Sequence, residues 1–264
     1  MLALSNPRLL RSLVLIDPVI QFSTSGLGPA AASTNRRDIW DSRASAAEKF
    51  AKSKFYQAWD PRVLDLWIKH GLRDLPTAIY PETEGSTDKR VTLTTSKHQE
   101  LFTFLRPTYR ADQFGGGLPD FHDPVSGARK PSAQMRYPFY RPEPLLAFSR
   151  LPELRPSVLY VFGETSDMST PEARRAKMEA TGSGAGGSGG AAEGRVKEVV
   201  LDCGHLVAME RVPQCAEAIV GFLGAELELW RGEQKRFEES RARVSGRELV
   251  MVDEQWKRMI KAKI

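Results

Sequence analysis

The sequence predicts an α/β fold, in which part of a parallel sheet is interrupted by a long, mostly helical insertion. Three short runs with strand character support this prediction, at residues 13–16, 157–162 and 196–201, and the first of them is apolar throughout. An uninterrupted apolar run of this length is typical of a strand buried in a parallel sheet. Each run ends in polar or turn-forming residues, and helical patterns fill much of the chain between and after the runs, as expected of an α/β fold.

The insertion follows from the distance between the first two runs. About 140 residues separate them, whereas a crossover helix needs only about a dozen. Residues 44–52, 60–68 and 96–105 show helical spacing or helix-start chemistry, such as the pair Asp60-Pro61. The far end, residues 114–140, is rich in Pro, Gly and aromatic residues and is predicted to be an irregular arm.

The predicted organisation therefore has four parts. A helix end and the first strand occupy residues 1–22, and the mostly helical lid occupies residues 23–150. The other two strands and a helix occupy residues 151–230, and a charged helical tail follows at 231–264. Residues 181–194 are almost entirely Gly, Ser and Ala, which bury little apolar surface, so we expect a disordered surface loop there. The lid residues Trp40, Trp59 and Trp67 either pack together or line an apolar pocket, and packing is the favoured interpretation.

Composition excludes several classes of protein. No run of about eighteen apolar residues suggests a membrane span, and Asn6, Pro7 and Arg11 do not fit a cleavable signal peptide. We therefore expect a soluble intracellular protein. The net charge of +5 comes largely from residues 231–264, which argues for a solvated tail rather than a nucleic-acid surface. Cys203 and Cys215 are expected to be buried and unpaired.

Three polar residues follow the three predicted strands. Asp17 comes after the first strand, Asp167 after the second and His205 after the third. In α/β sheets the catalytic groups gather at the carboxyl ends of the strands, so these three are the candidate site residues. His70, His98 and His122 have no partners at metal-like spacing, and we assign them no role; no cofactor or metal is expected.

A resemblance rests on three stretches of the chain. Residues 6–18 (Asn-Pro-Arg-Leu-Leu-Arg-Ser-Leu-Val-Leu-Ile-Asp-Pro), residues 158–163, and Gly204-His205 with Glu210 and Pro213 resemble the last three strands of the α/β-hydrolase superfamily. More narrowly, they are similar to fungal hydrolases of secondary metabolism, typified by the peroxisomal acyl-CoA hydrolase of the mycophenolic acid pathway and the AK-toxin biosynthesis hydrolases. The match is weakest in the lid.

The resemblance implies Ser-His-Asp chemistry on an ester or an acyl-CoA thioester, with His205 as the base. Position alone leaves the acid open between Asp17 and Asp167, while the narrower resemblance favours Asp17. The nucleophile of this family lies in a Gly-x-Ser-x-Gly elbow on the preceding strand, which we expect upstream of Met1. Ser188 also lies in a Gly-x-Ser-x-Gly motif, but this motif is part of a glycine run with no strand before it. We therefore reject Ser188 as the nucleophile. The alternative is a noncatalytic relic or binding fragment of such a hydrolase.

The last three residues suggest a cellular address. Ala262-Lys263-Ile264 matches the small-basic-aliphatic pattern of peroxisomal import signals, and Lys257, Arg258 and Lys261 precede it. Such a tripeptide is read by an import receptor. We therefore expect a peroxisomal protein, with the cytoplasm as the alternative.

Overall fold

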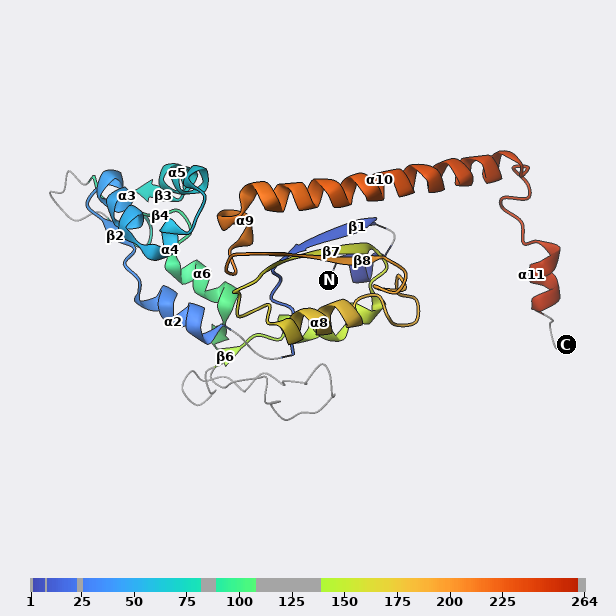
Figure 1. Cartoon of the computed structure of the whole chain (residues 1–264), viewed down its shortest axis with the longest axis horizontal. Helices are drawn as coiled ribbons and strands as arrows, with labels where there is room; N and C mark the ends of the chain where they lie inside the picture. The colour runs from blue at the N-terminus through green and yellow to red at the C-terminus, as the bar shows by residue number, and fades with distance from the viewer. Residues whose placement is uncertain (1, 8, 23–25, 82–88, 108–138, 261–264) are drawn as a thin grey trace. The chain divides into compact units, whose positions relative to one another are not determined.

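The computed structural model describes residues 2–7, 9–22, 26–81, 89–107 and 139–260 of the 264-residue chain (Figure 1). The chain divides into two compact units, Met1–Ile219 and Val220–Ile264. The first unit holds the parallel sheet, the lid and all three candidate site residues. The expected import tripeptide at residues 262–264 and His122 lie outside the described residues.

The parallel sheet has three strands in the order β1-β7-β8: β1 (Ser12–Ile16), β7 (Ser157–Gly163) and β8 (Val196–Leu201). Ser12 pairs with Ser157, and Val158 pairs with Val196. Every residue of the central strand β7 is buried, as its continuous apolar run predicts. The three strands predicted from the sequence are thus confirmed as neighbours in one parallel sheet, as Figure 1 shows.

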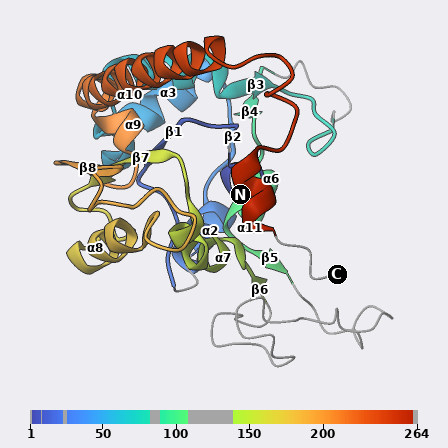
Figure 2. The same ribbon diagram turned by 90° about the vertical axis from the view of Figure 1, so that its right-hand side faces the viewer.

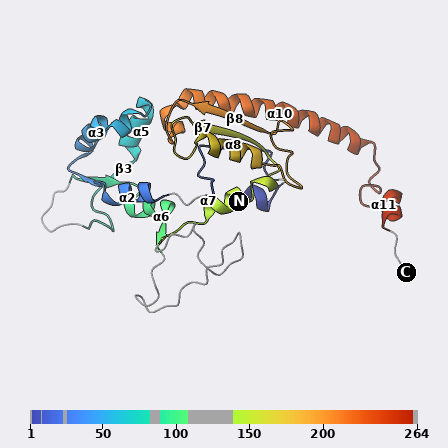
Figure 3. The same cartoon turned by 60° about the horizontal axis from the view of Figure 1, so that its bottom comes forward.

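One helix of the crossover between β7 and β8 packs against the sheet. This helix, α8 (Pro171–Ala180), begins after Thr170, whose side chain accepts a hydrogen bond from Ala173 N, and has Pro171 in its first turn. Both residues favour a helix start. Figures 1 and 3 show α8 beside β7 and β8.

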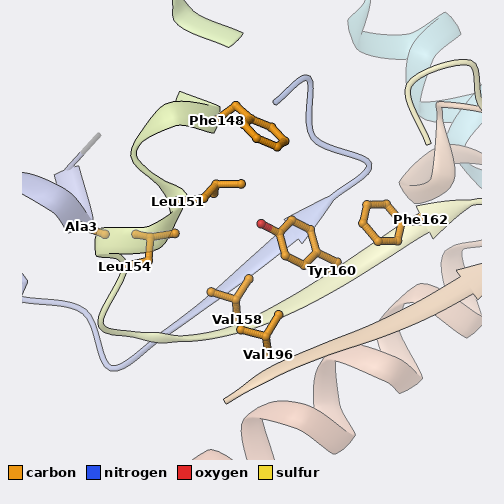
Figure 4. Packing of buried hydrophobic residues seen from close by; sticks show 8 residues of the cluster. All are labelled: Ala3, Phe148, Leu151, Leu154, Val158, Tyr160, Phe162 and Val196. Atoms are coloured by element: carbon orange, nitrogen blue, oxygen red, sulfur yellow. The ribbon is translucent and has the colours of Figure 1, made fainter. Parts of the chain in front are cut away.

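The core of the sheet combines residues that precede the lid in sequence, residues at its end and residues that follow it. Tyr160 and Phe162 of β7 stack with ring centroids 5.2 Å apart, and both are fully buried. Figure 4 shows them facing residues of α7 (Glu143–Ser149) and η2 (Leu151–Glu153). Members of the cluster are Ala3, Phe148, Leu151, Leu154, Val158, Tyr160, Phe162 and Val196.

The lid contains a small antiparallel sheet that the sequence did not predict. Its order is β2-β4-β3: β2 (Ile39–Trp40), β4 (Val91–Leu93) and β3 (Leu72–Asp74), seen side by side in Figure 2. Strands of two or three residues are too short to show a period of two. The expectation of a mostly helical lid is otherwise met, with α2 (Leu27–Asn35), α3 (Arg43–Lys52), α4 (Lys54–Gln57), α5 (Pro61–His70) and α6 (Lys97–Phe104).

Aromatic side chains fill the interior of the lid. Trp40 packs edge-on against Phe50 at 5.3 Å between ring centroids, and Trp59 packs against Trp67 at 5.9 Å. This packing agrees with the favoured interpretation of the lid tryptophans. Of the arm expected at residues 114–140, only Phe139–Tyr140 is described; it forms β6 and pairs with β5 (Arg106–Pro107).

The Gly/Ser segment at residues 181–194 is folded, in contrast to the disordered loop expected there. Ser188 N donates to Leu154 O at 2.9 Å, and Gly182 N donates to Leu151 O at 2.9 Å. Gly182, Gly186, Gly189, Gly190 and Gly194 adopt positive φ, which lets the chain turn tightly without a Cβ penalty. Backbone hydrogen bonds therefore order this segment, although it has few apolar side chains to bury.

The remaining described elements are helical. They are α1 (Leu2–Ser5), α9 (Val207–Glu210), α10 (Val212–Ala242), which runs across the boundary between the units, and α11 (Glu254–Met259). Cys203 and Cys215 are buried and free, as expected. Within the described part of the chain, no helix is both long and apolar enough to cross a membrane.

Candidate active site

The carboxyl ends of the three parallel strands bring polar residues together. Asp17 is the first residue after β1, Ser166 and Ser169 lie in the loop after β7, and His205 lies in the loop after β8. Because the strands are parallel and adjacent, these loops leave the sheet at the same edge. The site is thus assembled from segments almost two hundred residues apart in sequence.

His205 and Asp17 form a hydrogen-bonded pair. The distance between His205 Nδ1 and Asp17 Oδ2 is 2.7 Å. An ionised carboxylate can only accept, so Nδ1 carries the proton and Nε2 keeps its lone pair. Asp17 is 1% exposed, whereas the His205 side chain is 43% exposed. No described residue forms a hydrogen bond with Nε2, which leaves this atom available to an incoming group.

Asp17 receives three further hydrogen bonds. Ser166 Oγ donates to Oδ2 at 2.5 Å, Ser169 Oγ donates to Oδ1, and Gly163 N lies 3.3 Å from Oδ1. Burial raises the pKa of Asp17, but the hydrogen bonds from His205, the two serines and Gly163 outweigh it and hold the pKa below its ordinary value. The carboxylate is therefore ionised although it is buried.

The backbone of Asp17 also has an unusual conformation. Its φ is 38°, the only positive φ of a non-glycine residue in the described chain. Asp tolerates this region better than most residues do, but such a conformation still costs about 1–3 kcal/mol. The turn aims the carboxylate back at the loops that follow β7 and β8.

The loop of His205 is held by two close contacts. Glu210 accepts a hydrogen bond from Gly204 N at 3.2 Å, which gives the Glu210 of the sequence pattern a structural role. A Cβ built on Gly163 would lie 2.1 Å from Gly204 O, so only glycine fits at the end of β7. The hydrogen bond to Asp17 raises the pKa of His205, burial lowers it, and the charges of Asp17 and Asp167 raise it further, so the net shift is upward.

The other candidate acid, Asp167, lies between the two serines but points elsewhere. Its side chain is exposed, and it forms no hydrogen bond with any residue the structure describes. Its negative charge acts on His205 only through space. Sequence reasoning missed Ser166 and Ser169; their place in a loop directly after a buried strand was the signal that could have found them.

No described side chain is placed to act as a nucleophile on His205. Ser188 bonds to Leu154 O, which precedes β7, so it lies at the amino edge of the sheet and away from His205. Burial raises the pKa of the Cys203 thiol to about 11, which leaves it protonated at neutral pH. Ser166 and Ser169 are committed to Asp17. In the described residues no group of three or more His, Cys, Asp or Glu could hold a metal ion.

Solved structures share this fold. The peroxisomal α/β-hydrolase Lpx1 from Saccharomyces cerevisiae superposes with a TM-score of 0.54 and 13% identity, covering 97% of this chain and 59% of that protein. E-2-(acetamidomethylene)succinate hydrolase gives a TM-score of 0.51 and 15% identity, covering 84% of this chain and 60% of that one. No protein-family model matches the chain. The chain therefore has the α/β-hydrolase fold that these structures share.

Fungal proteins of related sequence include thioesterases and abhydrolase domain-containing proteins. The chain is 37% identical over 287 aligned residues to the type I acyl-CoA thioesterase mpaH' of Penicillium brevicompactum, covering 98% of this chain. It is 26% identical to the abhydrolase domain-containing protein ACTT2-1 of Alternaria alternata, over 84% of this chain and 77% of that protein. The chain spans 63% of the length of the mpaH' thioesterase.

Proposed function

We propose that this chain supplies the acid and base of a serine hydrolase that cleaves an ester or acyl-CoA thioester in fungal secondary metabolism. His205 is the base, and Asp17 is the acid that orients it. The observation that carries the proposal is the 2.7 Å hydrogen bond between His205 Nδ1 and the buried Asp17 carboxylate. Similarity to an acyl-CoA thioesterase supports the substrate class.

The geometry suits the chemistry of acyl transfer. A serine hydroxyl gives its proton to His205 Nε2 as its oxygen bonds to the acyl carbon. The imidazolium is stabilised by Asp17, and it then returns the proton to the departing thiolate or alkoxide as the bond to the acyl carbon breaks. A water molecule repeats these steps on the acyl-serine, releasing the acid and regenerating the serine.

We propose that the nucleophilic serine comes from a strand outside residues 1–264. β1 pairs with β7, and its other edge has no partner among the described strands. Such an edge accepts a further strand. Leu9, 61% exposed, and Ile16, 37% exposed, leave apolar surface beside β1 that another segment would cover. The greater length of the relatives leaves room for such a segment.

The test compares two polypeptides. Residues 1–264 should neither hydrolyse a medium-chain acyl-CoA nor react with a fluorophosphonate probe. The product of the reading frame extended upstream, if it encodes a Gly-x-Ser-x-Gly elbow, should do both. In that product His205→Ala should lower kcat by about 10³–10⁶-fold and Asp17→Asn by about 10³–10⁴-fold. Asp167→Asn is the matched control and should retain most activity.

Three results would overturn parts of this proposal. Thioester hydrolysis by residues 1–264 that His205→Ala abolishes would refute the external nucleophile. A larger loss from Asp167→Asn than from Asp17→Asn would assign the acid to Asp167. An upstream reading frame interrupted by stop codons throughout would favour a noncatalytic relic.

We also propose import into peroxisomes through Ala262-Lys263-Ile264. Its pattern supports this, and the solved relative from yeast is named as peroxisomal. A fluorescent protein fused ahead of residue 1 should give punctate fluorescence that coincides with a peroxisomal marker. Removal of the three residues should make the fluorescence diffuse; unchanged puncta would contradict the proposal.

A further inference from the structure

Lys177 is a buried cation behind the site that the proposed chemistry does not use. It lies on α8 and is 0% exposed. Its Nζ donates to Met168 O at 2.7 Å and lies 5.4 Å from the centre of the Phe162 ring. It forms no ion pair with any described residue. A lysine ammonium buried with one carbonyl and one ring face is costly, and a methionine there would bury the same stem without that cost.

The carbonyl that Lys177 holds belongs to the loop that serves Asp17. Met168 stands between Ser166 and Ser169, the two residues whose hydroxyls donate to the Asp17 carboxylate. Met168 N in turn donates a hydrogen bond to Ser166 Oγ at 3.1 Å. The ammonium thus fixes the middle of a short segment whose two ends contact the carboxylate.

We propose that Lys177 is a positioning residue for the Asp17–His205 pair, anchoring the loop 166–169 through the Met168 carbonyl so that both serine hydroxyls stay on Asp17. This inference rests on the proposed function of that pair. The positive charge of Lys177 also balances the buried carboxylate when His205 is neutral.

The charged groups around the Asp17–His205 pair determine the direction in which the pKa of His205 changes when the Lys177 charge is removed. Asp17, Asp167 and Lys177 are the groups that act on His205: the two carboxylates raise its pKa, and Lys177 lowers it. Burial lowers the pKa of Lys177 itself, and the charge of Asp17 opposes this. Removing the ammonium therefore takes away a like charge from His205, so the pKa of His205 should rise.

The experiment measures His205 directly, without activity. Lys177→Met keeps the length of the side chain but removes its charge and N–H donors. By NMR it should raise the titration midpoint of the His205 imidazole by about half a pH unit. It should also speed amide hydrogen exchange at Met168 and Ser169 at least tenfold. Global stability should stay equal or rise, which a merely structural role for Lys177 would not produce.

Two controls separate the anchor from a general effect of charge. Arg175→Met removes a positive charge from the exposed face of the same helix and should leave both readouts at wild-type values. Lys177→Arg keeps a charge and N–H donors and should stay closer to wild type than Lys177→Met. Equal readouts in Lys177→Met and wild type, or an equal shift in Arg175→Met, would overturn the proposal.

Two further measurements keep the result unambiguous. If Lys177→Met does not fold, the wild-type protein decides: a Lys177 ammonium without slowly exchanging protons in ¹⁵N NMR overturns the anchor. Asp17→Asn tests the pair itself, because loss of the Asp17 negative charge should lower the His205 midpoint. An unchanged midpoint in Asp17→Asn would refute the proposed pair, whatever Lys177 does.

Discussion

The parallel sheet and the lid differ in how far apart in sequence their partners lie. In the sheet, Ser12 pairs with Ser157, so the whole lid must be looped out before β1 meets β7. In the lid, Leu72 pairs with Leu93. Closing a long loop costs more chain entropy than closing a short one, although the cost grows slowly with length. The candidate site therefore depends on the least local contacts of the chain.

The two regions also treat their charged groups differently. In the sheet region Asp17 is buried and receives donors from the ends of β7 and β8. In the lid, Arg36 pairs with Glu100, and both side chains remain about 30% exposed. Pairs near solvent contribute little to stability. The buried network around Asp17 carries a larger desolvation penalty, and a functional role for Asp17 explains why such a buried charge is present.

The largest expected effect is the loss of core packing in the sheet. Phe162→Ala removes a fully buried ring that stacks on Tyr160, and should lower the free energy of unfolding by about 3–5 kcal/mol. Urea unfolding followed by circular dichroism measures this. The matched lid change is Trp40→Ala, which removes a ring that is 4% exposed. It should leave the His205 titration midpoint unchanged; a shift in that midpoint would mean that lid and site are coupled.

Gly163 in the sheet and Gly28 in the lid have very different surroundings. Gly163→Ala places a Cβ 2.1 Å from Gly204 O, and should cost about 3 kcal/mol because backbone must move. It should also displace His205, weakening the hydrogen bond to Asp17 that NMR detects. In the lid, a Cβ on Gly28 of α2 would meet nothing within 4 Å. Gly28→Ala should be neutral or stabilising by about 0.5 kcal/mol, and equal losses at both positions would contradict this.

The pair should give the first unit a pH dependence with a predictable sign. The pKa of Asp17 is lowered in the folded state, so its contribution is present above about pH 4 and lost as pH falls through the lowered pKa. The pKa of His205 is raised, so its contribution is present below about pH 6.5 and lost as pH rises through the raised value. Each contributes at most about 1.4 kcal/mol per pH unit.

The measurement is the free energy of unfolding from about pH 3 to pH 8, in wild type and in His205→Gln. The variant should lack the decline above pH 6.5. A decline of the same size in both proteins would show that other groups cause it.

Helix caps provide the smallest test. Thr170→Ala removes the N-cap of α8, which lies next to Ser169. Ser42→Ala removes the N-cap of α3, where the Ser42 hydroxyl accepts a hydrogen bond from Ser45 N at 3.1 Å. Each should cost about 1 kcal/mol. We expect only Thr170→Ala to speed hydrogen exchange at Ser169. Equal exchange in both variants would show that α8 does not hold the loop.

Local chemistry explains which elements could be predicted. The caps at Asp60-Pro61 and Ser96 lie where α5 and α6 begin, because a capping oxygen needs only its own next few residues. The strand at Val91–Leu93 was missed because its partners at Ile39 and Leu72 come from elsewhere in the lid. The order of residues 181–194 was missed because it comes from hydrogen bonds to Leu151 and Leu154, outside the segment.

Local patterns were enough to predict the three parallel strands, the polar residues that follow them and the resemblance that points to acyl transfer, because apolar runs and strand ends depend on neighbouring residues. Which carboxylate contacts His205 depends instead on how distant segments fold together. Asp17 and Asp167 both follow buried strands, but the positive φ of Asp17 turns its carboxylate toward the loops after β7 and β8, while Asp167 faces solvent. That direction, and the burial of Lys177 behind it, depend on contacts between distant segments.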